Sequence, residues 1–387
     1  MHNFTPPILK LKMITVEKIT GTKKLSDFID FPHELYKDEK NYVPELFLAQ
    51  KDLLDPKKHP FFEHSHLDLF LAYRDNKIVG RIAAIRNNNH IKFTGNNEGF
   101  FGFFDAINDE EVAGKLFDTA CDWVKKEGLN SIIGPANFST NEPFGLLIDG
   151  FDTPAMINTT YNFPYYAKLI EQYGFAKKVD LFAYKIEDTS VSDKSVKLSQ
   201  AFEERLKTKG ITIRPINMKI YNQEAEAASH VYNAAWDKNL GFVPMTKNEF
   251  LHLCKDMKLI VDPELCLVAE HEGKMIGFAF AIPNINQILQ KIKRGRLLPF
   301  GIFKLLFGLK KINSIRIVVL GVIEGYRKMG IEAIFYSKII TTCKAKNIHT
   351  AEASLILENN EMMNQGLLRI NATVYKTSRM YIKSIKG

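Results

Sequence analysis

Hydrophobic and polar residues follow two different spacings along the chain. Alternating, β-branched runs such as ITVEKI at 14–19 and ITIRPI at 211–216 predict strands. Apolar residues three and four positions apart predict helices at 110–126 and 331–345. The elements therefore predict an α/β fold (α+β, a mixed and largely antiparallel sheet with flanking helices).

The same order of elements occurs twice. At an offset of 197 residues, Asp68–Ile85 matches Leu265–Ile282, and both segments predict β-hairpins with polar turns. Tyr184 falls on Tyr381 within a predicted helix and terminal hairpin that close each half. We therefore expect two tandem domains.

We place the first domain at 1–188, a polar linker at 189–209 and the second domain at 210–387. Each half is expected to contain a long strand, a helix and another strand. These are predicted at 98–105, 110–126 and 131–133, and again at 315–323, 331–345 and 350–357.

Composition narrows the class of protein. The 387 residues are 45% hydrophobic and 25% charged, which is typical of a folded globular chain. The net charge of +8 suits an anionic partner: a nucleotide cofactor, a membrane or a nucleic acid. Four dispersed cysteines and the lack of a signal-peptide pattern predict a cytoplasmic protein without disulfides, and no metal site is predicted.

A candidate phosphate-binding loop lies at 324–330, between an apolar strand and a helix. Free amides at the helix start, together with Arg327 and Lys328, could hold a pyrophosphate. The segment resembles the R-x-x-G-x-G/A loop of the GNAT (GCN5-related) N-acyltransferase superfamily, with Arg327, Gly330 and Ile331 at matching positions. Glu332 departs from that motif, and its carboxylate would repel a phosphate.

The resemblance covers most of 211–385 and, through the repeat, 14–186. It implies that acyl-CoA, carrying an acetyl or longer acyl group, binds along Leu320, Gly321 and Val322, and that an amide of this strand polarises the thioester carbonyl. The first half lacks the loop and is expected to shape the acceptor site.

Direct attack by an amine requires a base and a proton donor. We expect Glu358, at the end of a strand, to be the base, and Tyr375 or Tyr381 to protonate the thiolate. The family's usual tyrosine position holds Leu367.

The long segment 134–166 carries many small and polar residues. Long loops in compact domains are often functional. We expect four of its side chains to line a cleft and bind the acceptor: Asn137, Asn141, Asn158 and Tyr161. The alternative is that each of them caps a turn.

A basic, apolar insertion occupies 286–311. In 291–311, lysine and arginine are mixed with leucine and phenylalanine. This pattern predicts that the segment contacts the inner face of an anionic membrane. The alternative is a helical hairpin packed on the core. No motif predicts DNA binding.

The chain resembles bacterial tandem proteins of this superfamily, some of whose relatives act in acyl-CoA-dependent ceramide synthesis. The expected function is therefore acyl transfer from CoA to a small-molecule or lipid amine. Two alternatives stay open: transfer of an amino acid from tRNA to a peptide, in which RNA would be a partner, and a non-catalytic module that binds acyl-CoA or lipid.

Overall fold

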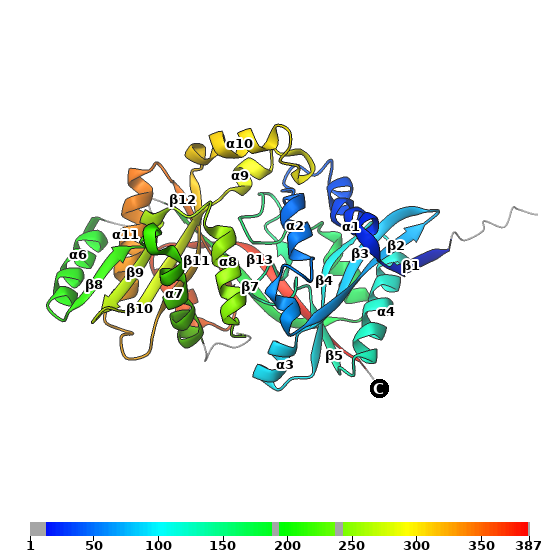
Figure 1. Ribbon diagram of the computed structural model, residues 1–387, viewed down its shortest axis with the longest axis horizontal. Helices are drawn as coiled ribbons and strands as arrows, with labels where there is room; N and C mark the ends of the chain where they lie inside the picture. The colour runs from blue at the N-terminus through cyan, green and yellow to red at the C-terminus, as the bar shows by residue number, and fades with distance from the viewer. Residues whose placement is uncertain (1–12, 188–192, 237–242, 386–387) are drawn as a thin grey trace, which may run out of the picture.

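A computed structural model describes residues 13–187, 193–236 and 243–385. Its strands form one continuous sheet. Most strands of the first half lie toward one end of this sheet, and most strands of the second half lie toward the other end (Figure 1). The mixed fold with flanking helices agrees with the prediction.

The elements of the first half are β1 (Ile14–Lys18), α1 (Gly21–Leu35), α2 (Phe47–Leu53), β2 (His66–Arg74), β3 (Lys77–Arg86), α3 (Asn88–Thr94), β4 (Glu98–Ala106), α4 (Glu110–Lys126), β5 (Ser131–Gly134), β6 (Leu146–Asp149), α5 (Tyr165–Gln172) and β7 (Ala176–Glu187). Those that follow are α6 (Asp193–Lys207), β8 (Ile211–Pro215), α7 (Tyr221–Trp236), α8 (Lys247–Met257), β9 (Cys266–His271), β10 (Lys274–Pro283), α9 (Asn286–Leu289), α10 (Gly301–Gly308), β11 (Ser314–Val322), α11 (Ile331–Ala345), β12 (Thr350–Leu357), α12 (Glu361–Arg369) and β13 (Thr373–Ser384). The order of the strands in the sheet is β1-β2-β3-β4-β5-β13-β7-β12-β11-β10-β9-β8, with β6 paired to β13.

The two predicted hairpins are confirmed. Their turns place consecutive residues in the left-handed region, at φ 51° and 61° for Asp75 and Asn76 and at 50° and 72° for Glu272 and Gly273. Such turns match the twist of the flanking strands, and Asn, Asp and Gly tolerate them. The turn residues therefore set the register of both hairpins.

The predicted terminal hairpins are wrong. Each half ends in one 12-residue strand, β7 or β13. Neither strand contains the Gly, Pro or Asn residues that a tight turn would favour.

These two strands exchange places between the halves. β13 pairs with β5 of the first half, β7 pairs with β12 of the second half, and the two strands pair antiparallel with each other. Each half therefore completes its sheet with the last strand of the other half.

Part of the predicted linker is helical. Helix α6 packs on α11, and an ion pair of 3.0 Å joins Lys338 to Glu203. Residues 188–192 lie outside the described part of the chain. The domain boundaries taken from the sequence stay a prediction.

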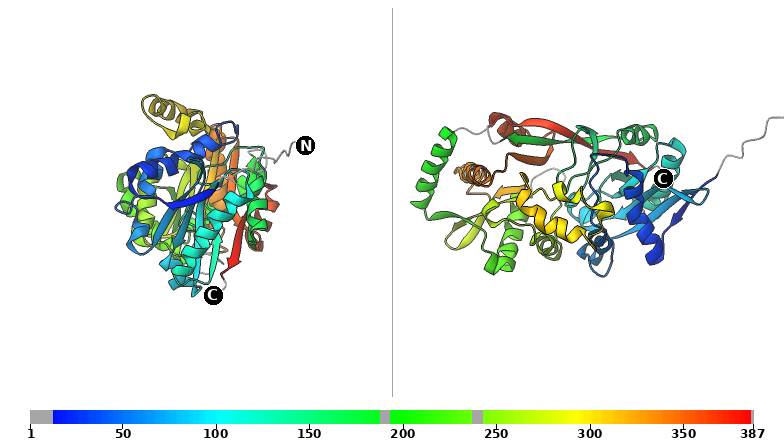
Figure 2. Two further views of the ribbon diagram at one scale, coloured as in Figure 1. Left: turned by 90° about the vertical axis from the view of Figure 1, so that its right-hand side faces the viewer. Right: turned by 90° about the horizontal axis from the view of Figure 1, so that it is seen from above.

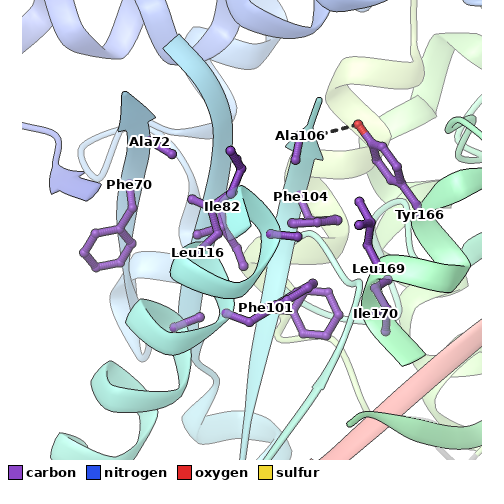
Figure 3. Packing of buried hydrophobic residues seen from close by; sticks show 14 of the residues in the cluster. Phe70, Ala72, Ile82, Phe101, Phe104, Ala106, Leu116, Tyr166, Leu169 and Ile170 are labelled. Atoms are coloured by element: carbon purple, nitrogen blue, oxygen red, sulfur yellow. Dashed lines mark hydrogen bonds between the residues drawn. The ribbon is translucent and has the colours of Figure 1, made fainter. Parts of the chain in front are cut away.

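Helices cover both faces of the sheet (Figure 2). In the first half, one core cluster lies under α4 and α5 and another under α1 and α2. In the first of these, Phe101 and Phe104 of β4 face Leu169 and Ile170 of α5 (Figure 3).

We predict that Tyr381→Ala destabilises the whole chain. Although Tyr381 lies near the C-terminus, it is fully buried in the core of the first half, where its hydroxyl donates to Glu171 at 3.0 Å. Removing a buried ring of this size costs about 3–5 kcal/mol. Urea unfolding followed by far-UV circular dichroism should show one transition, shifted to lower urea.

Val374→Ala, at an exposed position of the same strand, should change the midpoint little. Two separate transitions in Tyr381→Ala, with only one of them shifted, would contradict the coupling of the halves.

Candidate active site

A cavity of about 1010 Å³ lies where the two halves meet. It opens because β11 and β12 pair only from Ser314–Ile317 with Thr350–Ala353 and then separate. Its walls come from β10, β11, β12, α7, α8 and the start of α11, and from β4, β7 and the 134–166 segment of the first half. The cavity therefore draws on both halves.

Beyond Ile317, the edge of β11 that faces the cavity pairs with no strand of the described chain. Leu320, Gly321 and Val322 line the cavity here and pair with β10 on their other side. In an antiparallel pair, alternate residues direct their N–H and C=O groups away from the partner strand. The open edge therefore offers hydrogen bonds to an extended ligand.

The predicted phosphate loop lies at one end of the cavity. Gly330 has φ 91° and immediately precedes α11, so a side chain at this position would be strained. Arg327 lines the cavity, and its Nε donates to the Val322 carbonyl at 3.0 Å. Lys328 is exposed near the same helix start, whereas Ile331 is buried in the core.

Glu332 also lines the cavity, in the first turn of α11. Its charge complements the helix dipole. Burial, with a further contribution from Glu332, raises the pKa of Tyr336 to about 12. The carboxylate thus occupies the end of the cavity at which a phosphate would bind.

Of the three predicted catalytic residues, only Glu358 lines the cavity. Lys177 donates to its carboxylate at 2.7 Å, and the Asp180 amide does so at 3.0 Å. Tyr375 bonds to Glu352 instead, and Tyr381 lies in the first-half core.

Of the four residues predicted to bind the acceptor, two line the cavity and two do not. Asn141 and Asn158 line the cavity. Asn137 accepts a hydrogen bond from the Phe103 amide at 2.8 Å, and Tyr161 donates to the Phe151 carbonyl at 3.4 Å. Neither of these two contributes to the wall.

A buried polar network that the sequence did not predict lies beside the cavity. Arg316 is 6% exposed and lies 3.8 Å from the Glu352 carboxylate, which is 1% exposed. Ser354 and Tyr375 both donate to this carboxylate. The sequence does contain a sign of this network, because Arg316 and Glu352 are charged residues within two otherwise apolar strands, β11 and β12.

Arg316 also joins the halves. Its guanidinium donates to the carbonyls of Ile157 and Asn158, at 2.9 and 3.0 Å, in the 134–166 segment. Burial lowers the pKa of this guanidinium. The network therefore fixes that segment against the point at which β11 and β12 separate.

A second missed residue is Glu142, which lines the cavity. Burial raises its pKa to about 7, although Ser139 donates to its carboxylate at 2.7 Å. The adjacent Asn141 accepts from Tyr232 of α7 at 3.0 Å, which ties this loop to the second half. In the sequence, the sign that pointed to Glu142 was its position within the polar 134–166 segment.

Polar groups of the first half line another part of the cavity wall. Glu98 is bound by His90 and by Lys178, each at 3.0 Å. Burial alone would raise the pKa of Glu98, but these two partners lower it. Charged and hydrogen-bonding groups are thus available on this wall as well as at the α11 loop.

Comparison with known proteins identifies the family. The chain is 34% identical over 379 residues to a bacterial ceramide synthase of Caulobacter vibrioides, and the match covers 96% of this chain and 98% of that protein. The chain belongs to this family. Protein YghO of Escherichia coli is 34% identical over 394 residues, covering 98% of this chain and 99% of that protein. No family model matches the sequence.

Solved structures agree on the fold. A tandem GNAT protein from the clavulanic acid biosynthesis pathway has a TM-score of 0.56 at 8% identity, covering 97% of this chain and 99% of that one. A GCN5-related N-acetyltransferase from Sphaerobacter thermophilus has a TM-score of 0.53 at 12% identity, covering 97% and 96%. This family member therefore has the tandem GNAT fold, and fold and family together support acyl transfer.

We predict that Arg316→Met destabilises the protein by about 3–5 kcal/mol, because it leaves the Glu352 carboxylate buried without its cation. Urea denaturation at pH 7 measures the loss. Arg316→Met combined with Glu352→Gln should recover part of it.

Lys37→Met provides the comparison, because Lys37 forms an exposed ion pair with Glu34 and should have little effect. Equal midpoints for Arg316→Met and Lys37→Met would refute a structural role for the network.

Proposed function

We propose that this protein is an acyl-CoA-dependent N-acyltransferase that acts on a long-chain amine. The observation that carries the proposal is the continuity of the cavity. It reaches from the Arg327 loop along the open edge of β11 to apolar side chains of α8 and β10. A phosphate-bearing head, an extended amide-containing arm and an apolar chain could follow one another along this path.

The size and lining of the cavity support a long acyl chain. About 1010 Å³ lies at the upper end of the range for small-molecule sites. Several large apolar side chains contribute to the wall: Phe250, Leu253, Met257, Phe278, Phe280 and Leu355. An acetyl group would leave most of this surface uncovered, whereas a fatty acyl chain would bury it.

The relatives point to the same class of acceptor. A ceramide is the fatty amide of a long-chain amino alcohol, so the name of the Caulobacter relative agrees with transfer to such an amine. The polar groups Glu98, His90 and Lys178 on the cavity wall could bind hydroxyls of the acceptor.

The proposed reaction is a direct displacement. The amine nitrogen attacks the thioester carbonyl, the new C–N bond replaces the C–S bond, and CoA leaves as the thiolate. An amide from the open edge of β11 would stabilise the oxyanion. The amine's proton needs a base within the cavity.

Two carboxylates could serve as that base. Glu358 is the residue predicted from the sequence, but both of its carboxylate oxygens already accept hydrogen bonds, one from Lys177 and the other from the Asp180 amide. None of the residues that the structure describes forms an ion pair with Glu142, and its pKa of about 7 suits proton transfer near neutral pH. We assign the base to Glu142.

We predict opposite effects of two substitutions on CoA binding. Arg327→Ala should weaken binding of palmitoyl-CoA about tenfold, because a cation beside the phosphates is lost. Glu332→Gln should strengthen it several-fold, because a like charge is removed. Isothermal titration calorimetry at pH 7.5 measures both.

Acetyl-CoA and free CoA serve as controls for the acyl chain, and both should bind more weakly than palmitoyl-CoA. Formation of a fatty amide from palmitoyl-CoA and a long-chain amino alcohol, detected by mass spectrometry, tests the reaction itself. If no CoA species binds, the acyl-CoA proposal is wrong, and transfer from aminoacyl-tRNA or a non-catalytic role remains. Binding without amide formation would support the non-catalytic module.

We predict that activity depends on a group with a pKa near 7. Glu142 is protonated below that pH and cannot accept a proton, so kcat should fall as the pH decreases from 8 to 6. Glu142→Gln should lower kcat at least about a hundredfold and remove this dependence. The pH profile of amide formation checks both expectations.

Stability gives an independent measurement on the same residue. The folded-state pKa of Glu142 is raised, so its contribution to stability is greatest at low pH and is lost as the pH rises through about 7. The Tm of Glu142→Gln should therefore exceed that of the unaltered protein more at pH 8 than at pH 5. Glu358→Gln is the matched comparison. If it abolishes turnover while Glu142→Gln does not, Glu358 is the base.

A further inference from the structure

The second half carries an exposed apolar surface on α10 and the residues just before it. Five large side chains project there and together form what we call the α10 patch: Leu298, Phe300, Phe303, Leu306 and Phe307. Phe300 is 73% exposed and Phe307 75% exposed. Helix α10 stands at the outer edge of the molecule, above α9 (Figures 1 and 2).

The rest of α10 is fixed to the body by close packing. A Cβ on Gly308 would come within 2.8 Å of the Ile288 side chain, and one on Gly301 within 2.5 Å of the Arg296 carbonyl. Leu305 and Leu309 pack against the cluster around α9. Because this inner face is held in contact with the body, the α10 patch is held outward.

Positive charge surrounds the patch. No Asp or Glu occurs from Gly273 to Ile323. Arg294 and Arg296 approach carboxylates of α1, with Arg296 2.7 Å from Asp30. The lysines of 291–311 are all exposed: Lys291, Lys293, Lys304, Lys310 and Lys311. The outward surface thus combines apolar anchors with exposed ammonium groups.

We propose that the α10 patch binds the surface of an anionic lipid bilayer. Leucine and phenylalanine on a helix face enter the boundary between headgroups and acyl chains, while lysines beside them pair with lipid phosphates. No helix in the described residues is long and apolar enough to cross a membrane. Helix α10 has eight residues, whereas a helix needs about 20 to span a bilayer, so the proposed contact is interfacial.

The charge distribution disfavours a second copy of this chain as the occupant. Two α10 patches packed face to face would bring the lysines of both copies together without carboxylates between them. An anionic bilayer supplies both the apolar layer and the counter-charges. The proposal does not depend on the reaction catalysed.

Vesicle co-sedimentation of the full chain tests the proposal. The protein should bind vesicles that contain phosphatidylglycerol and phosphatidylcholine much more tightly than vesicles of phosphatidylcholine alone. Leu306→Ser/Phe307→Ser should weaken binding more than about tenfold at any salt concentration. Lys310→Gln/Lys311→Gln should weaken it about tenfold at low salt, with a smaller effect at high salt.

Leu198→Ser/Phe93→Ser is the matched control. It removes the same two residue types at exposed positions on α6 and α3, so vesicle binding should be unchanged. Equal losses in the control and in Leu306→Ser/Phe307→Ser, or no preference for anionic vesicles, would refute the proposal. Sedimentation velocity without lipid provides the last outcome: a dimer that Leu306→Ser/Phe307→Ser dissociates would make the patch a contact between copies.

Discussion

The pairing of β7 with β13 is the constraint on which the rest of the structure depends. Each strand ends one half of the sequence yet completes the sheet of the other half. Neither half can bury its core fully without a strand that is distant in the chain. Two copies of one pattern of elements therefore become one continuous sheet.

The exchange also explains why a cavity lies at the centre of the molecule. β11 and β12 separate after four paired residues, and β7 supports the far side of β12. Arg316 and Glu352 then hold the 134–166 segment of the first half against this opening. Burying these charges is costly, and they are tolerated because each is bonded to several partners. The resulting wall carries polar groups from both halves.

Two features of the second half have different origins. The loop at Arg327 and Gly330 is local, because a left-handed glycine and the start of a helix are sufficient to form it. The α10 patch exists because an insertion packs its glycine face inward and leaves leucine and phenylalanine outside. The proposed site and the proposed membrane contact are thus built from separate elements of one half.

The sequence by itself determined the features that depend on neighbouring residues. These were the repeat, both hairpin turns, helices α4 and α11 with their bounds, and the loop before α11. Only the tertiary structure decided which strands exchange, that Lys177 pairs with Glu358, and that neither Tyr375 nor Tyr381 lines the cavity. Only burial among distant segments could raise the pKa of Glu142. Turn and helix preferences act over a few residues, whereas strand pairing, ion pairs and desolvation depend on contacts between residues far apart in the chain.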